Sequence, residues 1–269
     1  MRQLEGKVAV ITGAGVIEPV SEQDTLNIGA ATALLYGRQG ARVVIADLQQ
    51  DMVDRTLNLL RREGHECVGC LSDITSFARC QALVEASIQA FGRLDILQNN
   101  AGAGWLGEGT ILAYNEALFD LNFSVNVKGL FNMTAAAAPA MAQTGGGAIV
   151  NISSVVAERH QLFPQLMYYN VSKAAVNAAT KAFAHELAPK GIRVNAIMPG
   201  SVRTVSNVQS ALIEAGEEGM AARERLWSTI PLGRPADPMD VAQASLFLAS
   251  AAASYVTGQI LAVDGGVLC

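Results

Sequence analysis

Seven short runs rich in Val, Ile and Leu, separated by longer segments of helical pattern, constrain the fold of this 269-residue chain most. A strand that is apolar along its whole length must be covered on both faces, as in parallel sheets with crossover helices. The pattern therefore predicts an α/β fold, a doubly wound Rossmann-type domain with a seven-stranded parallel sheet flanked by helices. The expected strands are residues 8–12, 42–46, 66–71, 95–99, 148–153, 193–197 and 260–263. The expected helices are residues 28–39, 50–63, 77–91, 115–143, 168–189 and 239–252.

One domain is expected over residues 1–269, because no linker, charge block, low-complexity tract or repeat divides the sequence. A formal net charge of −5 argues against nucleic-acid binding through a basic face. The sequence has neither a basic-then-apolar leader nor an apolar run long enough to span a bilayer. These features predict a cytoplasmic protein that binds neither nucleic acid nor membrane.

Four cysteines raise the question of a metal or redox site, since Cys67 and Cys70 form a Cys-x-x-Cys pair. They lie on an expected strand, where residues three apart point to opposite faces. No second cysteine pair or histidine cluster completes a site. Buried, reduced thiols and no metal are therefore expected.

Glycines at the end of the first strand predict a phosphate-binding turn. Gly13 and Gly15 follow the strand, and Asn27, Ile28 and Gly29 open the helix. Such a turn lets backbone N–H groups approach a pyrophosphate at a helix N-terminus. Asn27 stands where a second glycine is expected, and asparagine tolerates left-handed backbone geometry, which would preserve the turn.

Eleven residues, 16–26, interrupt this turn where one would suffice. The segment is either a surface excursion or a flap whose acids, Glu18, Glu22 and Asp24, change how the phosphates are held. Carboxylates near a pyrophosphate would repel it, which favours the surface excursion.

The ends of the next three strands suggest the rest of a dinucleotide site. Asp47 ends the second strand, where a carboxylate can accept hydrogen bonds from ribose hydroxyls and would repel a 2′-phosphate. Neither Leu48 nor Leu26 supplies the cation that NADP would require, so the sequence predicts NAD. Asp73 and Ile74, after the third strand, are placed to meet the adenine. Asn100, Ala101 and Gly102 follow the fourth strand, where small residues let the chain pass beneath the cofactor.

Tyr169 and Lys173 form a candidate catalytic pair. Residues four apart share one face of a helix, so the ammonium lies near the phenol. A tyrosine has a pKa of about 10, and a neighbouring positive charge favours its ionised form. Tyr169 is therefore a candidate acid or base, whereas Tyr168 has no lysine at that offset.

Together these residues resemble the short-chain dehydrogenase/reductase family across essentially the whole chain. Further matching pieces are Asn-Val-Lys-Gly at Asn126, Asn-Ile-Ser-Ser ending at Ser154, Pro-Gly-Ser-Val-Arg-Thr from Pro199 to Thr204, and Val-Asp-Gly-Gly from Val263. The resemblance implies a catalytic tetrad of Asn126, Ser154, Tyr169 and Lys173. It also implies that Pro199, Gly200, Val202 and Thr204 border the nicotinamide, with Thr204 and the Val202 backbone holding its amide.

The resemblance further implies the role of each tetrad residue. Ser154 would orient the substrate oxygen, and Tyr169 would take the hydroxyl proton as hydride leaves for the nicotinamide. Lys173 would lower the pKa of the tyrosine and hold the ribose, and Asn126 would fix a water that passes the proton onward. Ser154 and Tyr169 are fifteen residues apart, about two more than is usual, which leaves Ser153 as an alternative; the second serine of the pair is preferred.

By analogy, substrate would lie between residues 105–108, 155–168 and about 204–229. Most of these residues are apolar. Arg159 and His160 are the exceptions, and either capture a polar substrate group or point to solvent, the second being favoured. The predicted lining is Trp105, Arg159, His160, Phe163, Met167 and Trp227.

The leading functional hypothesis is an NAD-dependent oxidoreductase that interconverts a secondary alcohol and a ketone. An NADPH-dependent reductase of 3-oxoacyl thioesters is the alternative within enzymes, and a non-catalytic dinucleotide sensor is the alternative outside them. Alanine-rich stretches at 135–138 and 174–184 are expected to pair helices in a homotetramer, as is typical of the family. Packing within one chain would explain the same alanines.

Overall fold

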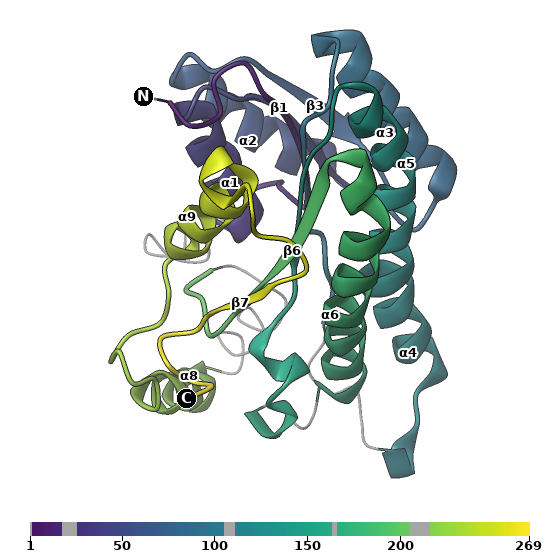
Figure 1. Ribbon diagram of the computed structural model, residues 1–269. Coiled ribbons are helices and arrows are strands. Elements are labelled where there is room, and N and C mark those ends of the chain that lie inside the picture. The colour runs from purple at the N-terminus through teal and green to yellow at the C-terminus, as the bar shows by residue number, and fades with distance from the viewer. Residues whose placement is uncertain (1, 18–25, 105–110, 163–165, 205–215) are drawn as a thin grey trace.

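The computed structural model describes residues 2–17, 26–104, 111–162, 166–204 and 216–269. All seven predicted strands are present and form one parallel sheet in the order β3-β2-β1-β4-β5-β6-β7 (Figure 1). The predicted doubly wound parallel fold is therefore confirmed. The strands are β1 Val8–Thr12, β2 Arg42–Asp47, β3 Cys67–Leu71, β4 Ile96–Asn99, β5 Gly147–Ile152, β6 Ile192–Pro199 and β7 Ile260–Val263.

Helices cover both faces of the sheet and enclose two apolar cores (Figure 1). One core lies beneath α1 Ile28–Arg38, α2 Gln50–Arg62 and α9 Pro238–Ala249. The other lies beneath α3 Phe77–Phe91, α5 Gly129–Gln143 and α6 Met167–Leu187. Coverage on both sides is why the central strands are largely apolar; every residue of β1 is buried.

The strand order reverses between β1 and β4, because β1 pairs with β2 on one side and with β4 on the other. In open α/β sheets, ligands bind beyond the carboxyl ends of the strands at such a switch point. The segments that follow β1, β2, β4 and β5 meet there, which brings together residues from four distant parts of the chain. The fold therefore brings the predicted residues that follow these four strands to one end of the sheet.

The prediction of one continuous helix over residues 115–143 is wrong, because the helix is interrupted by a π-helical turn. The segment consists of α4 Glu116–Phe123, a π-helical turn η2 at Ser124–Lys128, and α5. Asn115 caps α4 by accepting a hydrogen bond from Leu118 N at 3.1 Å. Such a π-turn inserts one residue into a helix and is frequent at functional sites. Periodicity does not reveal it, because the flanking residues keep a helical pattern.

A further helix, α8 at Gly216–Ser228, was not predicted. Its sequence carries weak signals, with Glu217 and Glu218 in the first turn and Arg225 in the last. Its apolar residues are too few to indicate a buried face. The other helix and strand boundaries lie within three residues of those predicted, close to the range in which helix ends fray.

The cysteines are free thiols, as predicted, but only Cys80 is buried. Cys67 and Cys70 are half-buried and pack against the two different cores, which confirms that they face opposite sides of the sheet. Cys269 is exposed. Among the described residues, no three His, Cys, Asp or Glu side chains are grouped as metal ligands would be. None of the described helices is both long and apolar enough to cross a bilayer.

Candidate active site

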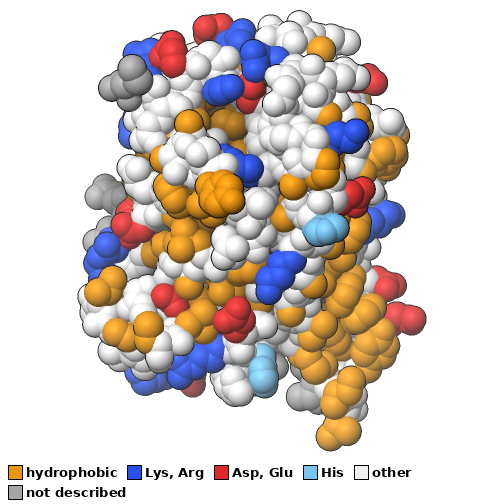
Figure 2. Space-filling model, viewed as in Figure 1, with side chains coloured by type: hydrophobic (Ala, Val, Ile, Leu, Met, Phe, Trp, Pro, Cys, Tyr) orange, Lys and Arg blue, Asp and Glu red, His pale blue; other side chains and the backbone are white. Residues whose placement is uncertain are grey.

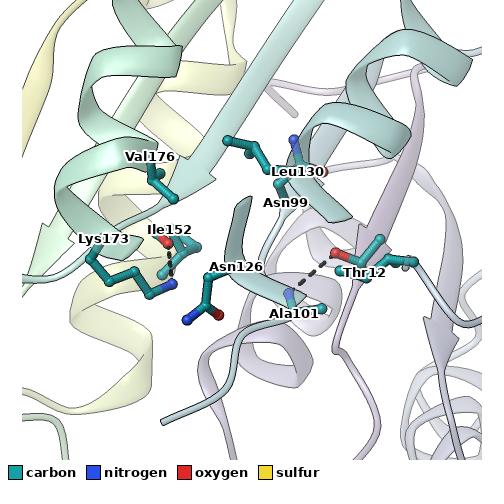
Figure 3. A pocket seen from close by; sticks show the side chains of 9 residues that line it. Thr12, Asn99, Ala101, Asn126, Leu130, Ile152, Lys173 and Val176 are labelled. Carbon is teal, nitrogen blue, oxygen red and sulfur yellow. Dashed lines mark hydrogen bonds between the residues drawn. The ribbon is translucent and has the colours of Figure 1, made fainter. Parts of the chain in front are cut away.

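Lys173 is a buried cation at the centre of the candidate site. It lies on α6 with 4% of its surface exposed, and its Nζ donates to the carbonyl oxygen of Ile152 at 2.9 Å (Figure 3). Burial disfavours the charged form and lowers the pKa of Lys173 to about 8. The ammonium lies 5.5 Å from the centroid of the Tyr169 ring, one helical turn earlier. The predicted Tyr169–Lys173 pair is therefore close in space.

The two neighbouring tyrosines have different environments. Tyr168 is buried, and its ring packs edge-on against Tyr114 and Phe119. Its hydroxyl accepts a hydrogen bond from Asn115 N at 2.8 Å. Tyr169 is half-buried and lies beside Lys173. Tyr168 therefore has a structural position, and Tyr169 is the tyrosine at the site.

Two glycines after β4 allow the chain to approach this pair closely. A Cβ atom on Gly104 would lie 2.9 Å from Cδ2 of Tyr169, nearer than real contacts allow. A Cβ atom on Gly102 would lie 3.1 Å from Lys173 Nζ and 3.3 Å from Asn126 Oδ1. Larger residues at these positions would displace Tyr169 and Lys173.

Asn126 lies in the π-turn η2, where its buried side chain holds the loop after β4. Its Oδ1 accepts from Ala103 N at 2.8 Å, and its Nδ2 donates to Ala103 O at 2.8 Å and Ser172 Oγ at 2.9 Å. Both amide hydrogens are thus used within the protein. A cavity of about 10 Å³, the space of one water molecule, is lined by Asn126, Lys173 and Asn99 among others (Figure 3).

The structure separates the two candidate serines. Ser153 is buried, and its hydroxyl donates to the Lys173 carbonyl at 3.1 Å, so it points into the protein. Ser154 is half-buried and begins the short turn η3, Val155–Ala157, with Oγ accepting a long hydrogen bond from Val156 N at 3.4 Å. The geometry favours Ser154 as the residue that meets substrate.

The turn after β1 is packed tightly enough to require glycine at two positions. Gly13 has φ +64°, and a Cβ atom there would lie 2.6 Å from Ala101 Cα. A Cβ atom on Gly29 would lie 2.5 Å from Gly13 O. Asn100 Nδ2 donates to the same carbonyl at 2.7 Å, and Thr12 Oγ1 accepts from the Ala101 N–H at 3.2 Å. The glycines thus keep side chains out of the space between the turn and the N-terminus of α1, which is the arrangement that suits a pyrophosphate, and the residues present fit a dinucleotide.

The expectation that Asn27 adopts left-handed geometry is wrong. Its backbone is extended, with φ −93° and ψ 171°, and Oδ1 caps α1 by accepting from Ala30 N at 2.8 Å. Its Nδ2 donates to Gly15 O at 2.6 Å. Asparagine here therefore joins the two sides of the insertion and satisfies an unpaired N–H group of the helix. Residues 18–25, with Glu18, Glu22 and Asp24, lie outside the described part of the chain.

Asp47 lies at the carboxyl end of β2 and faces the glycine turn. Its Oδ2 accepts from Gly15 N at 2.9 Å and its Oδ1 from Leu48 N at 2.8 Å. A carboxylate has about four acceptor positions, so this arrangement leaves room for two hydroxyl donors. The Leu48 side chain is 68% exposed and brings no positive charge.

Arg55 is a cation near the turn that the sequence reasoning missed. Its Nη1 donates to Val16 O at 3.3 Å, and its Nη2 pairs with Asp51 at 3.0 Å. The i,i+4 spacing of Asp51 and Arg55 predicts the ion pair. The contact with Val16 depends on how α2 packs against the turn and has no sequence signal.

The remaining predicted cofactor residues also lie at the strand ends. Asp73 is exposed, and its carboxylate accepts a hydrogen bond from Thr75 N at 2.9 Å. Ile74 is buried against Gly129, where an added Cβ atom would lie 2.5 Å from Ile74 Cδ1. Pro199 ends β6, and Ile28 begins α1.

The segment after β6 reaches back to the insertion. Gly200 packs so closely that a Cβ atom would lie 2.9 Å from Asp264 Cα, and Val202 bridges to Ala236. Thr204 Oγ1 donates to Leu26 O at 3.0 Å. Thr204, which the family motif assigns to the nicotinamide, is therefore hydrogen-bonded to the residue two positions before α1.

The predicted substrate residues are only partly brought together. Arg159 and His160 are exposed, and the Arg159 guanidinium donates to the carbonyl of Val267. Met167 is half-buried at the start of α6, and Trp227 Nε1 donates to Ser201 Oγ at 2.9 Å. Trp105 and Phe163 lie outside the described residues.

Comparison with known proteins agrees with this geometry. The family described as enoyl-(acyl carrier protein) reductase matches residues 24–268. The chain is 38% identical over 266 residues to 3-oxoacyl-[acyl-carrier-protein] reductase FabG of Thermotoga maritima, covering 99% of each chain. It is 35% identical over 264 residues to 7alpha-hydroxysteroid dehydrogenase of Escherichia coli, covering 98% of this chain and 95% of that one.

A solved structure shows the same fold. It is described as a short-chain dehydrogenase/reductase from Burkholderia xenovorans, and it superposes with a TM-score of 0.91 at 35% identity. The match covers 100% of this chain and 98% of that one.

Proposed function

This chain belongs to the short-chain dehydrogenase/reductase family of oxidoreductases, and on that premise we propose that it interconverts a secondary alcohol and a ketone with NAD. The observation that carries the proposal is the buried Lys173 ammonium beside the half-buried Tyr169. Asn126 lines the same small cavity as Lys173, and Ser154 lies two residues after the Ile152 carbonyl that Lys173 bonds. A lysine and a tyrosine in this relation supply an acid–base group near neutral pH. Their position at the carboxyl ends of the strands is where a dinucleotide binds in such a fold.

The chain's own residues would divide the work of oxidation as follows. Ser154 donates a hydrogen bond to the substrate oxygen and orients it. Tyr169 takes the hydroxyl proton, and the Lys173 ammonium favours the ionised phenol. Asn126 holds the loop after β4 against the pair through Ala103. The nicotinamide, when bound, accepts the hydride.

A preference for NAD is supported by Asp47. Its carboxylate faces the glycine turn with acceptor positions left for ribose hydroxyls, and it would repel a 2′-phosphate. The opposite preference has support as well, because the relative from Thermotoga maritima is a 3-oxoacyl-[acyl-carrier-protein] reductase and Arg55 lies at the same turn. An NADPH-dependent reductase of 3-oxoacyl thioesters is therefore the second candidate.

Steady-state rates with each cofactor test the proposal. A panel of secondary alcohols with NAD or NADP, and of ketones and 3-oxoacyl thioesters with NADH or NADPH, covers both candidates. We expect the highest kcat/KM with NAD and a secondary alcohol. A strong preference for NADPH with thioesters would establish the second candidate. Cofactor binding without turnover on the whole panel would favour a dinucleotide sensor.

Asp47→Ala should remove most of the discrimination between NAD and NADP. Losing hydrogen bonds from the ribose to a charged acceptor should lower kcat/KM for NAD about 10- to 100-fold, while the value for NADP rises or stays unchanged. Asp54→Ala on the exposed side of α2 is the matched control and should leave the ratio unchanged. Retained discrimination in Asp47→Ala would mean that another group reads the ribose.

We also propose that the chain forms a homotetramer through α5 and α6 and acts in the cytoplasm. Apolar side chains gather over α4 (Figure 2). Val171, on α6, is 54% exposed. Ala137, Ala179 and Ala184 are instead buried within the chain, as the core-packing alternative predicts. Val171→Asp should convert the tetramer to smaller species in light scattering, whereas Phe77→Asp on α3 should not. If the wild-type protein were a monomer, packing within one chain would explain the alanine-rich stretches of α5 and α6, and the proposed tetramer would be rejected.

A further inference from the structure

Helix α8 packs sparsely against the other helices and strands of the described chain. It lies beside the C-terminus, on the same side of the molecule as α9 (Figure 1). An element with few packing contacts lies at the low end of local stability. Side-chain bonds from α8 to other described segments are therefore a means of fixing its position.

One such bond comes from Trp227, in the last turn of α8. Its Nε1 donates to Ser201 Oγ at 2.9 Å, joining residues that are 26 positions apart. The guanidinium carbon of Arg223, one helical turn earlier, lies 4.4 Å from the centroid of the indole ring. Arg223 is itself 9% exposed. A cation stacked on the ring restricts its rotation and so keeps the N–H group aimed at Ser201.

Ser201 provides a rigid support for this bond. Its carbonyl accepts from Ala236 N at 2.9 Å, and Arg203 N donates to Ala236 O at 2.8 Å, so residues on both sides of Val202 are held by backbone hydrogen bonds. Gly200 packs directly against Asp264. The segment that carries Val202 and Thr204 is thus hydrogen-bonded to Ala236, in the loop that follows α8 in the sequence.

We infer that the Trp227–Ser201 hydrogen bond tethers α8 to the segment assigned to the nicotinamide, which makes Trp227 a positioning residue for substrate binding. Trp227 was expected only as an apolar wall of the pocket. The bond gives its indole N–H a separate role, which is to hold α8 at a defined place relative to the segment that carries Val202 and Thr204. The consequence for substrate rests on the proposed function, whereas the tether itself does not.

A double-mutant cycle tests the role in substrate binding. Trp227→Phe keeps a ring for Arg223 but loses the N–H group, and Ser201→Ala loses the acceptor. Each should raise KM for the alcohol about two- to tenfold with a much smaller change in kcat, because the acid–base residues are untouched. The double variant should be no worse than either single one. Additive effects, or an unchanged KM in both single variants, would overturn the inference.

Ser228→Ala is the matched control, since it removes from the same helix a hydroxyl whose bond within the described part of the chain is to Arg225 O of α8 itself. Its KM should equal that of the wild type. An increase equal to that of Ser201→Ala would show that any loss of a hydroxyl here has the same effect, and would overturn the specific tether.

Tryptophan emission tests the tether without any substrate. The chain has two tryptophans, Trp105 and Trp227, so a Trp105→Phe background reports Trp227 alone. Ser201→Ala in that background should shift the emission to longer wavelength as the indole becomes more exposed to water. An unchanged spectrum would overturn the tether. A shift in a protein without turnover on any substrate would support the tether and reject the proposed function.

Discussion

Tyr169→Phe should lower kcat about 10²–10⁴-fold, the usual range for a lost acid–base group, while NAD binding stays nearly intact. The substitution removes only the hydroxyl that exchanges a proton with substrate. The ring, which lies beside Gly104 and Lys173, keeps its packing. Steady-state kinetics with a secondary alcohol and titration of NAD binding measure the two quantities separately.

The adjacent tyrosine supplies the control. Tyr168→Phe also removes one hydroxyl, but that hydroxyl accepts from Asn115 N at the start of α4. We expect activity within a few-fold of the wild type and a loss in the free energy of unfolding of about 1 kcal/mol. If Tyr169→Phe retained full activity, Tyr169 would have no part in proton transfer.

Lys173→Met should abolish most activity and yet stabilise the fold. Activity should fall about 10²-fold or more, because the ammonium that favours the ionised Tyr169 phenol is lost. Burial lowers the pKa of Lys173 to about 8 from an ordinary value near 10.5, which at about 1.4 kcal/mol for each pKa unit destabilises the folded state by about 3 kcal/mol at pH 7. Methionine removes this penalty but leaves the Ile152 carbonyl without its donor, at about 1 kcal/mol. The net gain expected at pH 7 is about 2 kcal/mol.

The pH dependence of this gain has a definite sign. Between pH 8 and 10.5 the unfolded wild-type chain binds more protons at Lys173 than the folded one does, so wild-type stability rises with pH in that window. The penalty is fully present below pH 8 and falls below about 1 kcal/mol at pH 10. Urea unfolding of wild type and Lys173→Met at pH 7 and pH 10 should therefore show a gain that disappears at the higher pH.

Lys181→Met is the control for this experiment, because Lys181 is exposed on the same helix. It should change neither stability nor its pH dependence beyond a few tenths of a kcal/mol. A Lys173→Met protein less stable than the wild type at pH 7 would contradict the argument, since it would show that the contacts of the ammonium outweigh its burial.

The sequence contained enough information for the fold because the relevant signals are local. A strand buried on both faces is largely apolar, so the seven runs could be recognised in the sequence and predicted the sheet. The Tyr169–Lys173 pair could be predicted for the same reason, since helical spacing alone brings the two side chains together. Asp47 and the glycine turn were recognised from their places at strand ends.

Tertiary structure alone decided features that depend on contacts between distant segments. Asn27 caps α1 and bonds Gly15 across the insertion, which a preference for left-handed geometry did not anticipate. Ser154 is preferred over Ser153 as the residue that contacts substrate because the Ser153 hydroxyl donates to the Lys173 carbonyl inside the protein. Arg55 reaches the glycine turn only because α2 packs there.

The π-turn at Asn126 and the Trp227–Ser201 hydrogen bond are also features that only the tertiary structure decided. Residue type and spacing specify what a segment prefers to be, and for α6 and the strands that preference agrees with the final fold. They do not specify which side chain meets which across tens of residues, because that is set by how packed elements orient one another. The sequence therefore determined the sheet and the acid–base pair, whereas packing between elements decided how the loops and helix around them are held.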